Sequence, residues 1–230
     1  MRIVFCADIH GNHYAFDTFY NRMQAEKPDI IVFCGDVFGY FYGQENILSK
    51  MRKMKNLVCV MGNHDQYFLE VLEGLRDEEE LILRYGNSYH NIEHKIDSLN
   101  VQFVKEFLPY WYFQQDGIRI GAYHGSPDDY REARVYPDTE VLSVTNYIEY
   151  NYVILGHTHH KMVRHIGGTT VINPGSLGQQ RDGKGCSYLQ FDTMVGSYTF
   201  QEVEYDVASL LMEIEKYDSG REGLKEVLQR

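Results

Sequence analysis

Short, uninterrupted apolar runs alternate with amphipathic stretches at the start of the chain. Three of these runs lie within Arg2–Cys6, Asp29–Asp36 and Leu57–Asp65. Runs of this length bounded by Gly and polar residues are typical of strands buried on both faces of a sheet. Apolar side chains at helical spacing predict a helix after each of the first two runs, through Phe16, Phe19, Tyr20 and Met23, then through Ile47, Leu48, Met51 and Met54. This alternation predicts a parallel sheet with right-handed crossovers.

The stretch Gln66–Tyr110 interrupts the alternation and is rich in Glu, Tyr, Asn and His. Its clearest element is a predicted helix over Ser98–Leu108, with Ser98 as the N-cap and Pro109 just after the end. The apolar stripe of this helix consists of Leu99, Phe103, Val104, Phe107 and Leu108. We interpret the stretch as a helical insertion, at about residues 66–110, within a single domain that spans residues 1–230.

The second half of the chain has mainly the alternation of strands. A hairpin is predicted around the Asp116-Gly117 turn, followed by a helix over Asp138–Glu149 and a buried strand beginning at Tyr152. Further strands are predicted at Met162–Ile166, Thr169–Ile172, Cys186–Asp192 and Ser197–Val203, and closing helices at Val207–Tyr217 and Gly220–Gln229. The whole pattern predicts an α/β fold, a four-layer α-β-β-α sandwich of two mixed sheets flanked by helices.

Polar residues with metal-binding side chains follow nearly every predicted buried strand. The segments are DIH (residues 8–10), GD (35–36), GNHD (62–65), HGSP (124–127) and GHTHH (156–160). In open α/β sheets the ligand site lies beyond the carboxyl ends of the strands, so these side chains are expected to meet at one edge. Carboxylate, amide and imidazole groups together are suitable ligands for divalent transition metals.

Charge and cysteine usage limit the classes of partner. The chain has 22 basic and 33 acidic residues, a net charge of −11, which disfavours sequence-independent binding to nucleic acid or to an anionic membrane. The four cysteines lie in apolar strands and are interpreted as reduced core residues. The longest apolar run near the start, Ile30–Cys34, is far shorter than the ~20 residues that span a bilayer. We therefore expect a cytoplasmic protein.

Taken together and in this order, the five motifs resemble the calcineurin-like metallophosphoesterases, and NPGSLGQQRDG (173–183) extends the likeness. The residues around these motifs, GDVFGY (35–40), AYHGSP (122–127) and NPGSLGQ (173–179), are similar to those of a small bacterial phosphodiesterase or diadenosine-tetraphosphatase-like branch of this family. The resemblance implies a hydrolase with two divalent ions, Mn²⁺ in the first place and Fe, Zn²⁺ or Ni²⁺ as alternatives. It assigns Asp8, His10 and His159 to one ion, assigns Asn63, His124 and His157 to the other, and makes Asp36 the bridge.

The resemblance also implies the reaction, which is in-line attack of a metal-bridging hydroxide on phosphorus. His64 would serve the leaving oxygen, and Asp65 would orient His64. The expected substrate is a small phosphodiester or nucleotide, including dinucleoside polyphosphates. A protein phosphatase and a catalytically weak binding scaffold of the same fold are the alternatives, and the sequence leaves the oligomeric state open.

The residues that would bind the rest of the substrate are less determined by the sequence. Asn12 can contact phosphate or cap the following helix. Arg131, Arg134 and Arg181 are candidate phosphate clamps, because the guanidinium fork fits phosphate oxygens, and each can equally be a surface residue. Tyr40 follows Asp36 closely and can stack on a nucleobase or pack its loop against the insertion.

Overall fold

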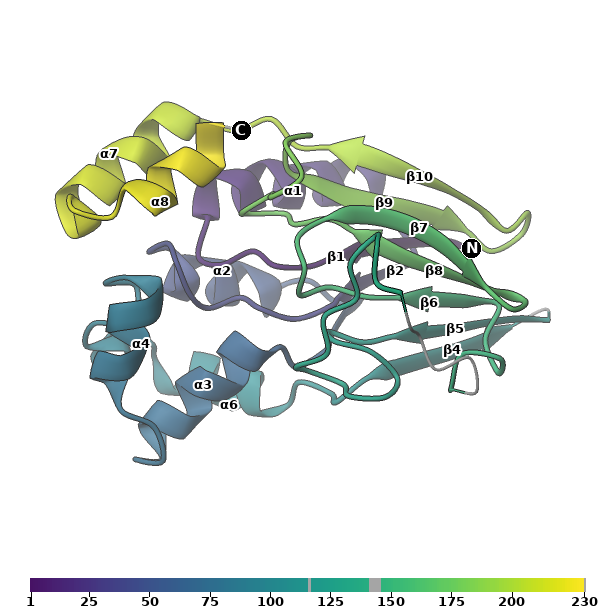
Figure 1. Cartoon of the computed structure of the whole chain (residues 1–230), viewed down its shortest axis with the longest axis horizontal. Coiled ribbons are helices and arrows are strands. Elements are labelled where there is room, and N and C mark those ends of the chain that lie inside the picture. Colours follow the sequence, from purple (N-terminus) through teal and green to yellow (C-terminus); the bar gives the residue numbers. More distant parts are fainter. Residues whose placement is uncertain (116, 141–145, 230) are drawn as a thin grey trace.

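The computed structural model describes residues 1–115, 117–140 and 146–229. Its centre is two five-stranded sheets that lie face to face (Figure 1). The first sheet has the order β10-β9-β1-β2-β3. Its strands are β1 (Arg2–Cys6), β2 (Ile30–Phe33), β3 (Leu57–Cys59), β9 (Ser187–Asp192) and β10 (Ser197–Glu202). The pairs β1–β2 and β2–β3 are parallel, whereas β9 runs antiparallel to β1 and to β10.

The second sheet has the order β4-β5-β6-β8-β7 and is mixed as well. Its strands are β4 (Trp111–Gln115), β5 (Ile118–Ala122), β6 (Tyr152–Ile154), β7 (Lys161–Ile166) and β8 (Thr169–Pro174). The inner strands β5, β6 and β8 are parallel, and the edge strands β4 and β7 pair antiparallel to their neighbours. The prediction of two mixed sheets is therefore confirmed.

Strand β1 shows why the runs are apolar throughout. Ile3 and Phe5 are 0% exposed and point into the core between the two sheets, where they meet Ile120 and Ile154 of the second sheet. Val4, between them, faces the opposite side and packs against the helices. Because successive residues of a strand point to opposite faces, a strand covered on both sides needs an apolar residue at every position.

Helices flank the first sheet (Figure 1). They are α1 (His13–Glu26), α2 (Gln44–Met51), α3 (Asn63–Leu72), α4 (Glu78–Tyr85), α5 (Ile92–Lys95) and α6 (Ser98–Lys105). The closing helices α7 (Val207–Asp218) and α8 (Glu222–Glu226), the latter extended by a 3₁₀ turn, Val227–Gln229, pack on Phe41 in the loop after β2. None of the helices in the described part of the chain has the length and the apolar character needed to cross a bilayer.

Several local predictions differ from the structure. The N-cap of α6 is Asp97, whose side chain accepts a hydrogen bond from the backbone N–H of Asn100, and Ser98 is the first helical residue. Leu99 and Leu108 were placed on the buried stripe of this helix but are 60% and 41% exposed. The helix ends at Lys105, so Leu108 lies beyond the periodicity that would have buried it.

The outer face of the second sheet is covered in a different way. Val153, Leu155 and Val171 form a core cluster there with Val135 and Tyr147, which belong to the segment between β5 and β6. A helix was predicted over residues 138–149, but residues 141–145 lie outside the described part, and the described flanks are turns and bends. Asp116 of the predicted hairpin turn also lies outside it.

Candidate functional site

The predicted ligands gather beyond the carboxyl ends of the parallel strands. Loops after β1, β2, β5 and β6 and the beginning of α3 each deliver one or two of them. All seven are buried, with exposed fractions between 0% and 7%: Asp8, His10, Asp36, Asn63, His124, His157 and His159. Burial of so many polar groups in one place requires partners for them, which in proteins are hydrogen bonds or a metal ion.

The backbone at these residues is unusual. Five of the predicted ligands have positive φ angles between 50° and 69°: Asp8, His10, Asp36, His157 and His159. Only eight non-glycine residues of the described chain share this property, and another of them is Tyr40. Side chains at positive φ cost conformational energy, and such residues cluster at functional sites. The i, i+2 pairs therefore converge through left-handed turns after the strands, and their backbone is not extended.

Asp8, His10 and His159 form one group of potential ligands, whose nitrogen and oxygen atoms all lie within 4.8 Å of one another. The two imidazole Nε2 atoms are 3.0 Å apart, and Asp8 Oδ1 lies 3.6 Å from His159 Nε2. The other carboxylate oxygen of Asp8, Oδ2, is buried without a hydrogen-bond partner. An acceptor of this kind, surrounded by imidazole nitrogens, is suited to a cation.

Asp36, His124 and His157 form a second group, again with ligand atoms within 4.8 Å of one another. His124 Nε2 lies 3.3 Å from Asp36 Oδ2, 3.1 Å from His157 Nδ1 and 3.0 Å from the side-chain oxygen of Asn63. The same oxygen of Asp36 is 3.8 Å from His10 Nε2 in the first group. Asp36 therefore lies between the two groups.

Backbone carbonyls fix the orientation of three of the imidazole rings. The contacts are His10 Nδ1 to the oxygen of Phe38 at 2.7 Å, His124 Nδ1 to that of Cys34 at 2.8 Å, and His159 Nδ1 to that of Gln179 at 2.7 Å. A carbonyl oxygen only accepts, so each Nδ1 carries a hydrogen, and in the neutral rings of His10 and His159 the Nε2 atom presents its lone pair to the site. His124 differs, because the charge of Asp36 outweighs burial and raises the pKa of His124 to about 9. Histidines that bind metals are commonly held in this way.

His157 differs because a side chain holds its outer nitrogen. The Nε–H of Arg134 donates to His157 Nε2 at 3.0 Å. Since arginine only donates, the lone pair of His157 lies on Nε2 and its hydrogen on Nδ1, the atom that faces the second group. Ligation through Nδ1 therefore requires Arg134 to release this contact.

Burial and mutual charge shift the pKa values of the whole cluster. Burial lowers the pKa of His10 and of His159 well below the usual value, and it lowers that of His157 to about 3. Burial also raises the pKa of Asp8 to about 8, and the charge of Asp36 adds to this shift. For Asp36 burial acts upward too, but the positive fields of His124 and its neighbours prevail and hold the pKa well below its usual value. The neutral imidazoles are in the protonation state that binds a metal.

His64 lies beside the two groups with its ring held by a tyrosine. Its Nδ1 is 2.8 Å from the hydroxyl of Tyr89, which is fully buried in the insertion. Burial raises the pKa of this hydroxyl well above its usual value, so it keeps its hydrogen and can donate it to Nδ1. The backbone oxygen of His64, the other acceptor near this hydroxyl, is more distant at 3.4 Å. When the hydroxyl donates to Nδ1, the ring hydrogen of a neutral His64 lies on Nε2. Gly39 leaves room for the ring, because a Cβ there would lie 2.5 Å from Nδ1.

Asp65 does not orient His64, contrary to the prediction. Its carboxylate accepts hydrogen bonds from the backbone N–H groups of Asp36, Val37 and Gly62, at 2.8, 2.8 and 3.0 Å. These contacts hold the loop that carries Asp36 against the beginning of α3. Asp65 therefore positions the residue between the two groups, and Tyr89 takes the place that was expected for Asp65.

A cavity of about 90 Å³ opens onto the two groups. Three residues predicted to bind substrate line it, Tyr40, Arg134 and Arg181, and two lining residues were not anticipated, Tyr85 and Tyr136. Tyr85 packs with its ring centroid 4.4 Å from that of His64. It belongs to the insertion, whose polar sequence carries no periodicity that would aim a given tyrosine at the site.

Two other predicted substrate residues lie elsewhere. The side chain of Asn12 is fully buried, accepts a hydrogen bond from the N–H of Ala15 and donates one to the oxygen of Gly178. It is thus the N-cap of α1, which was one of the two interpretations of this residue. Arg131 is exposed and donates to the side chain of Gln66.

A family model described as the calcineurin-like phosphoesterase superfamily domain matches residues 1–195. The chain belongs to the calcineurin-like phosphoesterase superfamily. Membership supports the hydrolysis of phosphoric esters as the class of activity, and the superfamily is metal-dependent. The search of curated proteins finds no match.

Solved structures show how widely this calcineurin-like fold is shared. A metallophosphoesterase from Sphaerobacter thermophilus has a TM-score of 0.77 at 22% identity, covering 100% of this chain and 99% of that one. The hypothetical protein PH1004 from Pyrococcus horikoshii has a TM-score of 0.78 at 17% identity, covering 99% of this chain and 97% of that one. YfcE, a phosphoesterase from E. coli, has a TM-score of 0.53 at 16% identity, covering 89% of this chain and 100% of that one. At such identities the likeness shows the fold alone.

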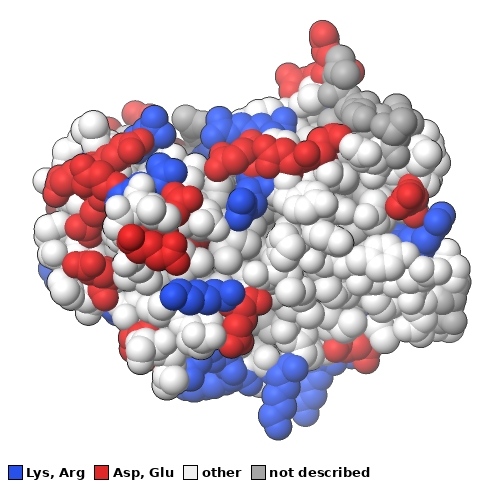
Figure 2. Space-filling model, turned by 90° about the horizontal axis from the view of Figure 1, so that it is seen from below, with Lys and Arg blue, Asp and Glu red and all other residues white. Residues whose placement is uncertain are grey.

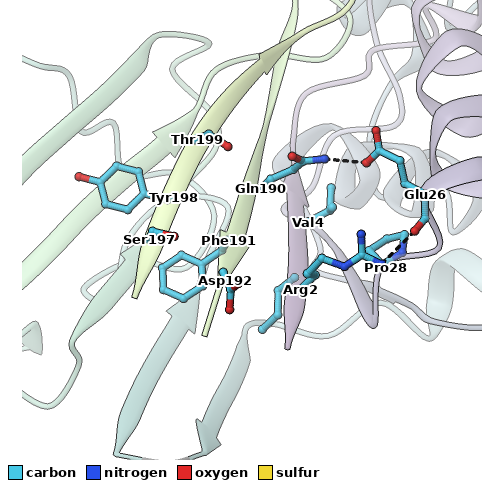
Figure 3. Close-up of a pocket in the computed structure, with 11 residues that line it drawn as sticks. Arg2, Val4, Glu26, Pro28, Gln190, Phe191, Asp192, Ser197, Tyr198 and Thr199 are labelled. Atoms are coloured by element: carbon cyan, nitrogen blue, oxygen red, sulfur yellow. Dashed lines mark hydrogen bonds between the residues drawn. The ribbon is translucent and has the colours of Figure 1, made fainter. Parts of the chain in front are cut away.

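A second hollow of this calcineurin-like chain, about 160 Å³, lies at the opposite end of β1 (Figure 3). Its polar side chains bind one another and the backbone. The guanidinium of Arg2 donates to the backbone oxygens of Glu26 and Lys27, and the side-chain amide of Gln190 donates to the carboxylate of Glu26. The hollow contains none of the predicted site residues, so we place the function at the strand ends.

Proposed function

We propose that the protein hydrolyses a small phosphodiester or nucleotide with the help of two divalent ions. The observation that carries the proposal is the pair of buried ligand groups with Asp36 between them. Asp8, His10 and His159 would hold one ion, while Asn63, His124 and His157 would hold the other, and Asp36 would contact both. The side chains fit such ions because an oxygen of Asp8 is buried without a partner and because the neutral imidazoles of His10 and His159 present unprotonated Nε2 atoms.

Two divalent ions at this place would activate the attacking water and neutralise the phosphoryl oxygens. Mixed carboxylate, amide and imidazole donors favour borderline ions, and we propose Mn²⁺ as the first to test. The superfamily's metal dependence supports the presence of metal, while the donor set carries the choice of ion.

Two kinds of side chain would act on the substrate directly. His64, with its ring hydrogen on Nε2, would donate a hydrogen bond to the departing oxygen and stabilise the negative charge that develops there, and Tyr89 would keep the ring in this orientation. Arg134, which lines the cavity, would bind the phosphoryl oxygens through its guanidinium fork. Released from His157, Arg134 could reach a phosphoryl oxygen.

A small substrate is also consistent with the surface of the molecule. Over the helical part of the face in Figure 2, basic side chains occur in separate patches between acidic ones. This face therefore offers no continuous basic path for a nucleic-acid backbone. Tyr40 lies at the cavity with its ring centroid 4.8 Å from that of His10 and could stack on a base.

Metal analysis combined with a phosphodiesterase assay tests the proposal. Protein reconstituted with Mn²⁺ should bind two ions per chain and hydrolyse bis-4-nitrophenyl phosphate, and a chelator should abolish the activity. His64→Ala should keep both ions and lose ~10²–10⁴-fold in rate. One ion per chain, or full stoichiometry without hydrolysis of any phosphate ester, would contradict the proposal.

A further inference from the structure

The cavity of about 90 Å³ over the two groups of potential ligands is the smaller of two adjoining spaces. The reacting phosphoryl group of a substrate would lie in this cavity. The rest of the substrate would extend into the neighbouring space.

A larger cleft of about 510 Å³ adjoins this cavity and shares three lining residues with it: Tyr40, Tyr85 and Arg181. Its remaining walls come from Arg84 at the end of α4 and from residues 220–224 with Val227 at the closing helices. These closing helices lie beyond residue 195, where the family match ends. The cleft is therefore partly built by a segment outside the matched domain.

The charge of the cleft is opposite to that of the protein. The chain carries a net charge of −11, yet the lining contains three arginines, Arg84, Arg181 and Arg221, against one acidic residue, Glu222. Glu222 is itself paired with Lys225 at 3.1 Å. An anion is therefore the favoured occupant, because the positive charges are concentrated in a concave surface.

Two of the three arginines have charge to offer a ligand. Arg181 donates to the hydroxyl of Tyr40 at 3.0 Å and to the side-chain oxygen of Gln179 at 2.6 Å, which are both neutral. Arg84 is 60% exposed and lies 3.7 Å from Glu80, a surface pair of small energetic value. Arg221, in contrast, is used by the fold, since it bonds to the carboxylate of Asp218 and to backbone oxygens of α4.

Asp218 makes this wall a fixed part of the molecule. Its buried carboxylate accepts hydrogen bonds from the hydroxyl of Tyr42 at 2.7 Å and from the N–H of Asn87 at 2.9 Å, in addition to the contact with Arg221. One residue thus joins α7, the insertion and the loop after β2. Through Arg221, which donates to the backbone oxygens of Ile82 and Leu83, these contacts also hold the end of α4 that carries Arg84.

We infer that this cleft binds a second phosphate group of the substrate, through Arg84 and Arg181. The inference rests on the proposed function and narrows its substrate class to esters that carry another phosphate away from the reacting one. Tyr40 and Tyr85 would contact the group that connects the two phosphates. Dinucleoside polyphosphates and nucleotides with phosphates at two positions belong to this class.

The test compares matched substrates with the metal-loaded protein. Thymidine 5′-(4-nitrophenyl phosphate) is measured with and without a 3′-phosphate, and diadenosine tetraphosphate provides a longer phosphate spacing measured against bis-4-nitrophenyl phosphate. We expect at least one substrate with a second phosphate to exceed its partner about tenfold in kcat/KM. A factor of this size corresponds to one charge-assisted hydrogen bond. Arg84→Gln and Arg181→Gln should each reduce that advantage about tenfold, mainly through KM. Arg52→Gln, on an exposed residue outside the cleft, should preserve it.

The outcomes separate the inference from the proposed function. If the protein hydrolyses the simple esters but shows no advantage for either doubly charged substrate, or keeps the advantage in both cleft variants, the inference is overturned. If no ester is hydrolysed, the proposed function itself fails. Added sulfate, at constant ionic strength, should raise KM for the favoured substrate and leave KM for its partner unchanged. An Arg84-dependent increase in KM that is equal for both substrates would show a site for free anions and would overturn the inference.

Discussion

The hydroxyl of Tyr89 is a single atom whose removal tests the role of His64. Tyr89→Phe keeps the fully buried ring and deletes the contact of 2.8 Å to His64 Nδ1. A buried nitrogen left without its partner costs about 1–3 kcal/mol. Since about 1.4 kcal/mol corresponds to a factor of ten, we expect the orientation needed for donation to the departing oxygen to become ~5–150-fold less populated.

This loss should depend on the leaving group. We expect Tyr89→Phe to slow the hydrolysis of a phenyl ester more than that of a 4-nitrophenyl ester, because 4-nitrophenolate leaves readily without a proton. The measurement is kcat/KM for both esters at fixed pH, with metal content determined for each variant. Tyr85→Phe is the matched control, since its ring also packs on His64, with centroids 4.4 Å apart, but the bond from Tyr89 remains.

In the control Tyr85→Phe, any loss of kcat/KM relative to the unsubstituted protein should be the same for the phenyl and the 4-nitrophenyl ester. An equal loss on both esters in Tyr89→Phe, with both ions retained, would refute the orienting role of the hydroxyl. Loss of an ion would instead show that Tyr89 supports the ligands.

Two further substitutions test how the ligands are held. Asp65→Asn replaces one of the two carboxylate oxygens that accept from the N–H groups of Asp36, Val37 and Gly62 with an N–H₂ group, which cannot accept. The free energy of unfolding, measured by urea denaturation, should therefore fall by about 2–6 kcal/mol. A decrease below about 1 kcal/mol would contradict this. Arg134→Met frees His157 Nε2, so Mn²⁺ affinity measured by calorimetry should rise up to about tenfold; unchanged or weaker binding would show that Arg134 does not restrain the ligand.

The sequence predicted that these polar side chains lie together because the order of parallel strands imposes it. Any polar side chains that follow neighbouring parallel strands meet at one edge, whatever the details of the loops. Asp8 and Asp36 could therefore be placed near each other without knowing how either loop turns. The backbone conformation could not be inferred from spacing, and the left-handed turns at these residues, with φ of 57° and 69°, became visible only in the structure.

The hydrophobic and polar pattern of the sequence could not predict which residues of the insertion contact His64. Tyr89 and Tyr85 approach His64 because α3, α4 and the following loop pack together, and tertiary contacts of that kind leave no periodicity in a polar stretch. The only available signal was the presence of two tyrosines four residues apart in an insertion next to GNHD. The role of Asp65 was misassigned for a related reason, since adjacency to His64 in sequence suggested a contact that α3 directs elsewhere.

The left-handed ligands have a consequence for how such a chain changes over generations. Each non-glycine residue at positive φ costs of the order of 1 kcal/mol, so the five ligands together forgo several kcal/mol, comparable with the whole net stability of a marginal domain. Glycine at these positions would relieve that cost. A lineage in which these five side chains were no longer needed would therefore gain thermal stability by replacing them with glycine.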